Sequence, residues 1–259
     1  MRNKLLVMKN IKLNYKSVGN NIDQILLFVH PLGVDHSVFN KVMEGLYQDY
    51  TCYSVDIRGH GKSPVVEPPY SIDEMAEDIS FTFSFDKPVN VMGVSIGGMI
   101  AMSLAIKKLI PIKKLILSDT GHVIGNYKLW QERIDLVNSG GLQKIVDMAI
   151  ERWFPEEFRT KFPELMDDCK RLQLKTPVKG YVGACQAIQS ANLTDEVFKI
   201  ENDTLVINGT KDISTPPELG MQLKDLIPNG TFKELDGIGH VPPLQDPNLT
   251  IKILKEFLN

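Results

Sequence analysis

One stretch of the chain constrains its fold more than any other: residues 89–104, which read VNVMGVSIGGMIAMSL. A β-branched run suited to a buried strand leads through Gly93-Val94-Ser95-Ile96-Gly97 into an apolar run suited to a buried helix. A strand that becomes a helix almost without a loop must turn sharply, and glycines two residues before and after Ser95 let the two backbones pass closely. The G-x-S-x-G spacing therefore predicts a serine exposed above a sheet, with a helix N-terminus beneath it.

Strand and helix signals alternate on both sides of this turn. An opening hairpin is expected from strands at 5–8 and 11–18; further strands are expected at 25–30 and 50–57, in the quoted stretch, and at 112–119, 204–209 and 231–237. Helices are expected around 38–47, at 73–85, after Ser95, around 217–226 and at 247–258. This alternation predicts an α/β fold with a mostly parallel sheet of eight strands, flanked by helices.

Between roughly His122 and Leu193 the strand signals stop. This stretch has helical periodicity and contains both tryptophans of the chain. Ordinary core helices could fill it, but a segment of about 70 residues without a strand is long for a connection inside a compact domain. The sequence favours a helical cap at 122–193, inserted after the sixth strand of a core domain formed by 1–121 and 194–259.

The composition argues against several classes of function. The 259 residues carry a formal net charge of −3, which predicts neither nucleic-acid binding nor a basic membrane-binding face. The N-terminal apolar run is too short for a signal peptide, and no stretch approaches the length of a membrane span. Cys52, Cys169 and Cys185 form no CxxC pair, which argues against a zinc site or a disulfide framework and favours a reducing cytoplasm.

A serine hydroxyl is a weak nucleophile at neutral pH, so it needs a base and a carboxylate that orients the base. In a sheet of this type the three groups follow the chain order Ser, Asp or Glu, His. His240 lies in a loop just past the last expected strand, where open α/β sheets place their ligand sites. His30 and His60 lie in the turns HPLG and RGHG, where bonding to the backbone is expected, and His36 lies near a helix start. We therefore predict His240 as the base.

Two aspartates compete for the orienting acid. Asp212 follows the strand TLVING in the loop GTKDISTPP, and Asp119 ends the strand LILSD one element earlier. We favour Asp212, because its loop, rich in glycine and proline, leaves the carboxylate free to point inward. Asp119 would otherwise anchor the start of the helical insertion.

The chemistry also requires hydrogen-bond donors for a developing oxyanion. The backbone N–H of Ile96, directly after the nucleophile, is one candidate. The turn HPLG offers the other: Leu32 carries an N–H just past Pro31, which has none, and Gly33 lets the backbone bend. The alternative is a turn that is tight for structural reasons alone.

These motifs carry a family resemblance. The segments HPLG, DIRGHGKS, GVSIGGM, GTKD and GIGH occur in the order and spacing of the α/β-hydrolase superfamily and together span most of the chain. The segments WQERIDLVNSGG, ERWFPEEFR and GYVGACQAIQSANLTDEV resemble the branch of 3-oxoadipate enol-lactonases and related esterases. The resemblance implies a catalytic triad of Ser95, Asp212 and His240, with Leu32 and Ile96 as the oxyanion donors. HPLG departs from the HG or NS lead common in that loop.

The expected function is a serine hydrolase of small carboxylic esters or lactones that works through an acyl-enzyme, with 3-oxoadipate enol-lactone as one candidate substrate. No metal or organic cofactor is expected. The cap should supply selectivity through Trp130, Arg133, Trp153 and Phe154, and the Arg133 guanidinium would suit a carboxylate-bearing lactone. The alternative is that the tryptophans form the core of the cap and that Arg133 is solvated.

Other functions stay open at this point. A hydrolase of C–C bonds in vinylogous diketones would use the same triad, as would a perhydrolase. Some members of the superfamily act as ligand receptors or signalling partners while keeping the triad. The expected partner is a small-molecule ester or lactone, not nucleic acid or membrane, and both a monomer and a homo-oligomer are compatible with the sequence.

Overall fold

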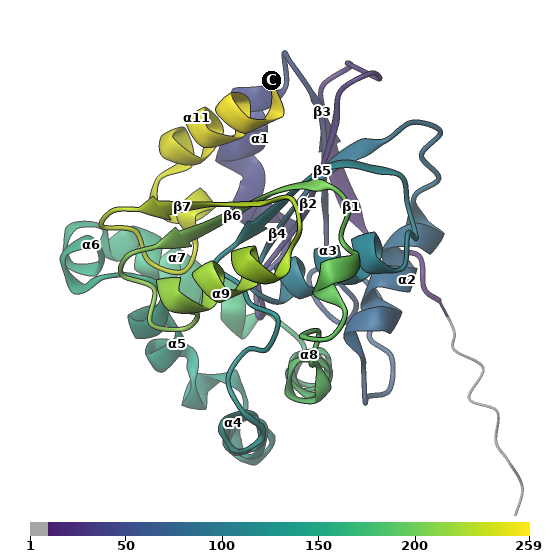
Figure 1. The fold of residues 1–259 in the computed structure, drawn as a ribbon. Helices are drawn as coiled ribbons and strands as arrows, with labels where there is room; N and C mark the ends of the chain where they lie inside the picture. Colours follow the sequence, from purple (N-terminus) through teal and green to yellow (C-terminus); the bar gives the residue numbers. More distant parts are fainter. Residues whose placement is uncertain (1–9) are drawn as a thin grey trace, which may run out of the picture.

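A seven-stranded sheet runs through the molecule in the order β1-β3-β2-β4-β5-β6-β7 (Figure 1). This computed structural model describes residues 10–259. The edge strand β1 (Tyr15–Val18) pairs antiparallel with β3 (Thr51–Val55), and the other neighbouring strands pair in parallel. The sequence predicts eight strands and the described residues hold seven, because the strand expected at 5–8 lies outside them.

The other strands and the helices around the sheet begin and end close to the positions expected from the sequence, apart from two short helices, at 197–199 and 242–245, that were not predicted. The strands are β2 (Ile25–Val29), β4 (Val89–Val94), β5 (Ile112–Ser118), β6 (Asp203–Gly209) and β7 (Gly230–Leu235). The helices are η1 (His36–Phe39), α1 (Asn40–Leu46), α2 (Ile72–Thr82), α3 (Ile96–Ile106), η3 (Val197–Lys199), α9 (Pro217–Leu226), α10 (Pro242–Gln245) and α11 (Pro247–Leu258).

Local sequence explains several of these boundaries. The Ser71 side chain accepts from the Glu74 N–H while Glu74 accepts from the Ser71 N–H, a capping box that fixes the start of α2. Both α9 and α11 open with a proline at the first helical position, where the missing N–H costs no hydrogen bond.

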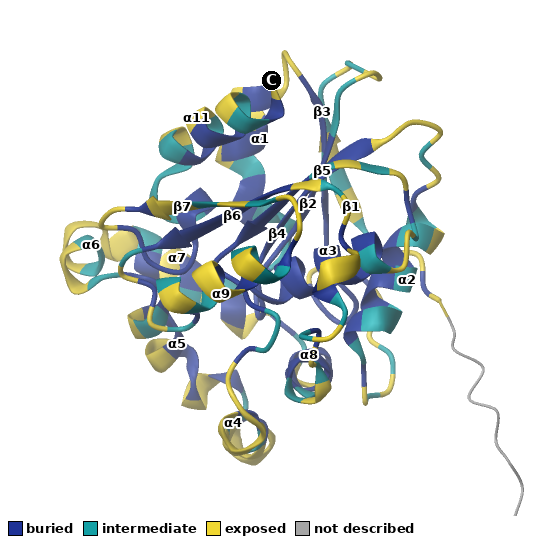
Figure 2. Ribbon diagram, in the orientation of Figure 1, coloured by how far each residue is buried: buried dark blue, intermediate teal, exposed yellow. Residues whose placement is uncertain are grey.

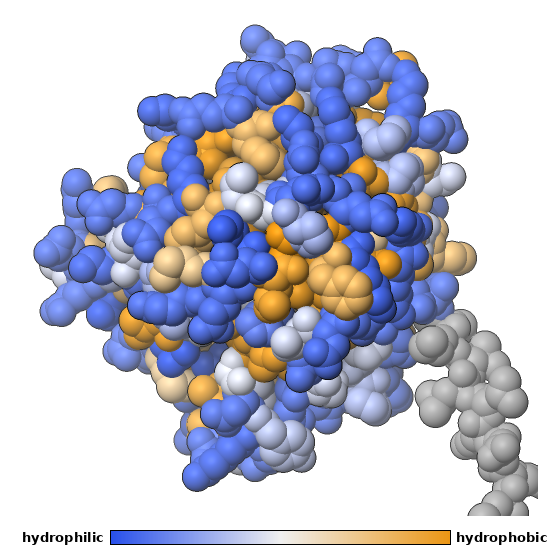
Figure 3. All heavy atoms as spheres, viewed as in Figure 1, coloured by the Kyte–Doolittle hydropathy of each residue, from blue (hydrophilic) through white to orange (hydrophobic). Residues whose placement is uncertain are grey.

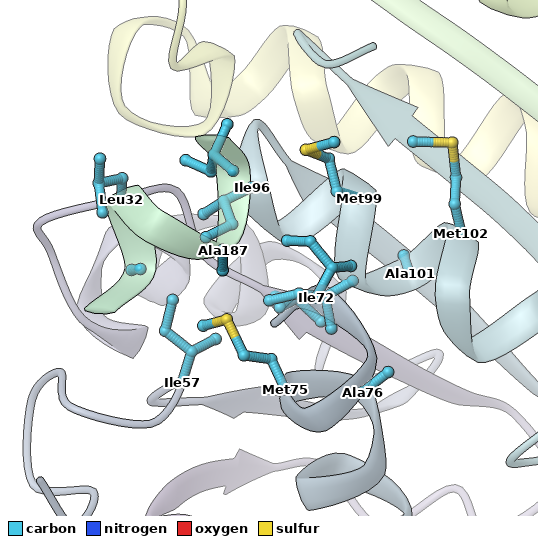
Figure 4. Packing of buried hydrophobic residues seen from close by; sticks show 14 of the residues in the cluster. Leu32, Ile57, Ile72, Met75, Ala76, Ile96, Met99, Ala101, Met102 and Ala187 are labelled. Atoms are coloured by element: carbon cyan, nitrogen blue, oxygen red, sulfur yellow. The ribbon is translucent and has the colours of Figure 1, made fainter. Parts of the chain in front are cut away.

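The sheet is covered on both faces, and β2 shows how. Successive strand residues point to opposite faces: Leu27 and Val29 pack in one cluster with residues of α2 and α3, while Leu26 and Phe28 pack in another with residues of α1 and α11. Because both faces are buried, the strand is apolar throughout and shows no alternation. Figure 2 shows these central strands in the buried class, and Figure 4 shows part of the first cluster, with Met75 of α2 and Met99 of α3.

Between β5 and β6 the described chain forms helices and no strand. They are α4 (Tyr127–Gly140), η2 (Leu142–Lys144), α5 (Val146–Trp153), α6 (Glu156–Lys161), α7 (Pro163–Leu174) and α8 (Val178–Ser190). In Figure 1 the helices α4, α5 and α8 lie together on one side of the sheet. Buried residues of α8, among them Ala184 and Cys185, belong to the same cluster as Leu27. The division of the chain into a core domain and a cap stays a prediction.

Hydrophilic side chains cover most of the face seen in Figure 3, with separate hydrophobic patches between them. No helix in residues 10–259 is long and apolar enough to cross a membrane. Cys52, Cys169 and Cys185 are free and buried, and burial raises the pKa of each thiol to about 12. A thiol with such a pKa is a poor nucleophile at neutral pH, so these three cysteines act as small buried side chains.

Candidate active site

Ser95 stands at a strained turn between β4 and α3. Its φ of 57° and ψ of −121° are unusual for a residue with a side chain. A Cβ atom added to Gly93 would lie 2.1 Å from the Gly97 carbonyl oxygen, and one added to Gly97 would lie 2.2 Å from the Val29 carbonyl oxygen. Only glycine fits at these two places, so the G-x-S-x-G spacing has the steric cause inferred from the sequence.

Neighbouring groups hold this strained backbone in place. The Ser95 N–H donates to the Ser118 carbonyl at 3.0 Å, and the Thr120 hydroxyl donates to the Ser95 carbonyl at 2.6 Å. Both partners come from β5 or directly after it, so the adjacent strand fixes the nucleophile turn. The Ser95 side chain faces a pocket that His240 also lines.

His240 and Asp212 form a buried pair above the same edge of the sheet. Asp212 follows β6, His240 follows β7, and the His240 Nδ1 lies 2.8 Å from Asp212 Oδ2. Asp212 also accepts from the Ser214 N–H, from the Thr215 N–H and, at 2.6 Å, from the Thr215 hydroxyl. Burial opposes ionisation of Asp212, but the charge of His240 and these hydrogen bonds outweigh it and lower the pKa of the carboxyl group. Asp212 is thus an ionised acceptor that orients the His240 ring.

The end of helix α5 holds His240 from the opposite side. The His240 N–H donates to the Trp153 carbonyl at 2.8 Å, and the centroids of the two rings lie 6.2 Å apart. Gly239 makes this approach possible, since a Cβ atom there would lie 2.2 Å from the Trp153 carbonyl oxygen. His240 is therefore held between the loop that follows β7 and the end of α5.

Asp119, the rival acid, lies in a different environment. It is fully buried, and its side chain accepts from the Gly209 N–H at 2.9 Å and from the Ser118 hydroxyl at 2.6 Å, with no bond to His240. Burial, and then the negative charge of Asp212, raise the pKa of Asp119 well above its ordinary value. The geometry favours Asp212 as the partner of His240 and leaves Asp119 bonded to Gly209 and Ser118.

Leu32 and Ile96, the expected oxyanion donors, are buried in the same hydrophobic cluster (Figure 4). Among the backbone hydrogen bonds of the described residues neither N–H donates to a protein carbonyl. Gly33 adopts a φ of +83°, and a Cβ atom there would lie 2.9 Å from the Tyr181 ring. The turn thus packs closely against α8 while it leaves the Leu32 N–H available.

His30, His36 and His60 are tied to the backbone or to a carboxylate, whereas Nδ1 of His122 is buried without a hydrogen-bond partner among the described residues. The His30 Nδ1 lies 2.7 Å from the Pro31 carbonyl, and His30 Nε2 accepts from the Ile57 N–H. The His60 Nδ1 lies 3.1 Å from the Arg58 carbonyl, and burial lowers the pKa of His60 to about 3. Neutral, backbone-bonded imidazoles of this kind fit the structural role expected for the HPLG and RGHG turns.

Asp35, His36 and Asp56 form the one group of potential metal ligands found in the described residues. The atoms that could bind a metal already make hydrogen bonds. Asp56 accepts from the backbone N–H and Nδ1 of His36, from Asn14 and from the Lys62 N–H, and Asp35 accepts from Ser37. Burial opposes ionisation of Asp56, but these bonds hold its pKa well below the ordinary range. The cluster is a saturated hydrogen-bond network that ties the β3 turn to η1.

The pocket above Ser95 has an empty volume of about 580 Å³, part of it open to solvent. Its lining comprises Leu32, Ser95, Ile124, Gly125, Leu129, Trp130, Arg133, Ala149, Arg152, Trp153, Gln173, Tyr181, Ser214, Thr215 and His240. Three of the four cap residues singled out from the sequence are among them. Phe154 is not: it is buried and its ring stacks on that of Phe158, with the two centroids 5.6 Å apart.

Sequence reasoning missed Arg152 and Gln173. Arg152 directly precedes Trp153 in ERWFP, and Gln173 is a buried polar residue on α7. For Arg152 the neighbouring tryptophan was an available signal. For Gln173 no local pattern distinguishes a pocket residue from a solvated one, because the orientation of α7 comes from tertiary packing.

Comparisons with known proteins agree with this geometry. The profile of the family described as alpha/beta hydrolase fold matches residues 24–247. The 3-oxoadipate enol-lactonase 2 of Acinetobacter baylyi is 28% identical over 244 residues, which cover 93% of this chain and 91% of that protein.

Two solved structures are similar over nearly the whole chain. The crystal structure of the enol-lactonase from Burkholderia xenovorans superposes with a TM-score of 0.91 at 26% identity, covering 95% of this chain and 96% of that one. A thermophilic esterase from Thermogutta terrifontis superposes with a TM-score of 0.87 at 24% identity, covering 96% and 93%. The family profile thus covers most of the chain, including the residues that form the pocket.

Proposed function

The chain belongs to the alpha/beta hydrolase fold family, and we propose that it is a serine hydrolase of small carboxylic esters or lactones, with 3-oxoadipate enol-lactone as a candidate substrate. One observation carries the proposal: a strained Ser95 and a His240 bonded to Asp212 face one pocket, next to two unpaired backbone N–H groups. The similarity to enol-lactonases supports the substrate class.

In the proposed first step, Ser95 Oγ attacks the acyl carbon while His240 removes its proton. Because Nδ1 of His240 donates to Asp212, Nε2 is the nitrogen left to accept that proton. Asp212 keeps the ring in this tautomer and stabilises the imidazolium that forms. The Leu32 and Ile96 N–H groups hold the oxyanion, and preorganised donors of this kind are worth about 3–4 kcal/mol each in other hydrolases.

When the tetrahedral intermediate collapses, the bond from the acyl carbon to the leaving oxygen breaks and His240 gives its proton to that oxygen. In the second step the neutral His240 activates a water molecule that cleaves the acyl-enzyme. For a lactone the released hydroxyl group is part of the acyl chain, so a single product leaves the pocket. Every proton transfer in the cycle uses His240, and the proposed mechanism needs no metal or organic cofactor.

We propose that residues 122–193 act as a cap that selects the substrate. Arg133 lines the pocket and its guanidinium carbon lies 5.3 Å from the centroid of the Trp130 ring. A guanidinium can hold a carboxylate through two parallel hydrogen bonds, so Arg133 would bind the free carboxylate of an acidic lactone. A cytoplasmic location is also proposed, in keeping with three free cysteines.

The test is a screen of the purified protein against simple esters, enol-lactones and vinylogous diketones, combined with labelling by a fluorophosphonate. We expect rapid multiple turnover of esters or lactones and labelling of Ser95 alone, with no labelling of a Ser95→Ala control. Turnover of diketones only would indicate C–C bond hydrolysis. A single slow turnover with tight retention of the ligand would instead indicate a receptor.

A further inference from the structure

Two arginines face the pocket from two different helices. Arg133 comes from α4 and Arg152 from α5, and both side chains are partly buried beside Ser95 and His240. The arginine salt bridges found in residues 10–259 are those of Arg58 and Arg171. Neither pocket arginine therefore has a carboxylate partner within that part of the protein.

The two charges act on each other. Burial lowers the pKa of Arg152, and the positive charge of Arg133 lowers it further. Two like charges held close together and partly out of water are unfavourable unless an anion lies between them. Asp212 is the ionised carboxylate near Arg152, but its oxygens already serve His240, Ser214 and Thr215.

Each guanidinium is oriented and still has donors to spare. Arg152 Nη2 donates to the Ile213 carbonyl at 3.1 Å, and Arg133 lies over the Trp130 ring. A guanidinium carries five N–H donors, so one such contact fixes its position without using its capacity. Both groups are therefore preorganised for a ligand that accepts hydrogen bonds.

Gln173 adds a third unused donor to the same pocket. Its side chain lies on α7, the residue is 2% exposed, and its Nε2 has no hydrogen-bond partner among the described residues. A buried amide without a partner is costly, and such groups in native proteins commonly mark a missing ligand or water. An acceptor oxygen on the substrate would satisfy it.

We propose that Arg152 and Arg133 together hold a single carboxylate of the substrate and that Gln173 donates to a second, uncharged oxygen of the same molecule. A single carboxylate suits two guanidiniums that line one pocket, because each of its two oxygens can accept hydrogen bonds from a different guanidinium. The inference rests on the proposed hydrolysis at Ser95 and assigns Arg152 and Gln173 as additional residues that determine its specificity.

The experiment uses two esters that differ in one charge, monomethyl glutarate and dimethyl glutarate. The readout is the ratio of their kcat/KM values in the wild type, in Arg133→Met, in Arg152→Met and in the double variant. We expect each single variant to lower the ratio at least tenfold, and the double variant to lower it by clearly less than the product of the two. The effects of replacing two residues that bind the same group are not additive, whereas the effects of replacing two independent residues are.

Two controls separate binding from folding. Arg171→Met removes an exposed arginine of α7 that pairs with Asp168 outside the pocket, and the ratio should stay at the wild-type value. Arg152→Lys keeps the charge and one donor for Ile213, so it should retain more of the ratio than Arg152→Met. An Arg152→Met ratio equal to that of the wild type would overturn the assignment, and exact additivity would mean that the arginines bind separate groups.

Gln173 is tested with a near-isosteric change. Gln173→Glu places a carboxylate in the pocket and should lower the ratio at least tenfold, while Gln173→Leu should lower kcat/KM for both esters alike, because it removes a donor to an oxygen that both share. Equal ratios in the two variants would contradict a contact between Gln173 and the bound substrate.

A binding measurement keeps this inference distinct from the proposed hydrolysis. In a Ser95→Ala background, calorimetric titration should show that monomethyl glutarate binds at least tenfold more weakly once Arg152 is also replaced by Met. If no ester is hydrolysed but this difference appears, the clamp stands and the proposed reaction fails. If esters are hydrolysed but the difference is absent, the clamp fails alone.

Discussion

The sheet edge and the helical wall of the pocket differ in how their polar groups are satisfied. At the sheet edge Asp212 accepts hydrogen bonds from Ser214, Thr215 and His240, and the His240 backbone is bonded to Trp153. The helical wall of the pocket is the side that α4, α5 and α7 form. There Arg133 and Arg152 lack carboxylate partners within residues 10–259, and Nε2 of Gln173 has no hydrogen-bond partner in that range. The hydrogen bonds of the groups proposed to perform the chemistry are thus satisfied within the protein, whereas the groups proposed to bind the substrate keep unpaired donors.

This difference has a physical cause. A nucleophile, base and acid must be fixed before the substrate arrives, because reorganisation during the reaction would raise its barrier. Groups that recognise a substrate gain most when the substrate is their only partner, since an incorrect ligand then leaves them buried and unpaired. The sheet edge should accordingly control kcat for every substrate, and the helical wall should control the choice among substrates.

The largest effect is expected at the nucleophile. Ser95→Ala should lower kcat by a factor on the order of 10⁴ or more for charged and neutral substrates alike, because no other group in the pocket replaces the hydroxyl. Steady-state kinetics with both ester types measures this, and circular dichroism checks that the fold is kept. Near-wild-type turnover by the variant would end the serine-hydrolase proposal.

The second effect concerns the two buried aspartates. Asp212→Asn should lower kcat by about 10³–10⁴, because the amide cannot orient His240 in the required tautomer. Asp119→Asn should cost far less, since Asp119 makes no hydrogen bond to His240. Comparing kcat for the two variants tests the ranking, and a reversed order would move the acid to the end of β5.

The helical wall should behave differently from both. Arg133→Leu should weaken a carboxylate-bearing lactone or ester by about 2–4 kcal/mol in kcat/KM, by analogy with the loss of one partner of a buried charge pair. A neutral ester should lose much less, because it never needed the cation. An unchanged ratio of the two kcat/KM values would mean that Arg133 is a solvated residue that does not bind the substrate carboxylate.

The same contrast explains what the sequence could predict. The turn around Ser95 depends on glycines two residues away, and the chain order of Asp212 and His240 follows from parallel strands that end at one edge. Such local or topological rules are visible in a single sequence. The predicted starts of α9 and α11 agree with the structure for a similar reason, because a proline begins each helix.

The helical wall follows no such rule. Trp130 and Arg133 lie on neighbouring faces of one turn and reach the pocket as expected. Phe154, one residue past Trp153, does not line the pocket and stacks on Phe158. The backbone becomes extended at Phe154, where α5 ends, so its side chain leaves the pocket direction. Arg152 and Gln173 depend on how α5 and α7 pack, which periodicity does not determine.

The smallest expected effect comes from His60, which lies in the turn that follows β3. Its Nε2 is buried without a hydrogen-bond partner, and burial lowers its pKa to about 3. The unfolded chain takes up this proton near pH 6.5 and the folded protein does not, so His60 makes the folded state less stable as the pH falls from 6.5 toward 3. Between pH 7 and 5 the loss is about 2 kcal/mol.

His36 acts in the opposite direction, because its bond to Asp56 raises its pKa and stabilises the folded protein at acidic pH. A comparison of the wild type with His60→Phe cancels this contribution, which both proteins share. Urea unfolding at pH 7 and pH 5 should therefore show a smaller loss of stability in the variant, by about 2 kcal/mol. NMR titration should find His60 neutral at pH 5 and His36 still protonated above pH 6.5. If the two proteins lost stability equally, the folded protein would have to bind a proton at His60. The sheet edge around this ring would then be more open to water than its hydrogen bonds indicate.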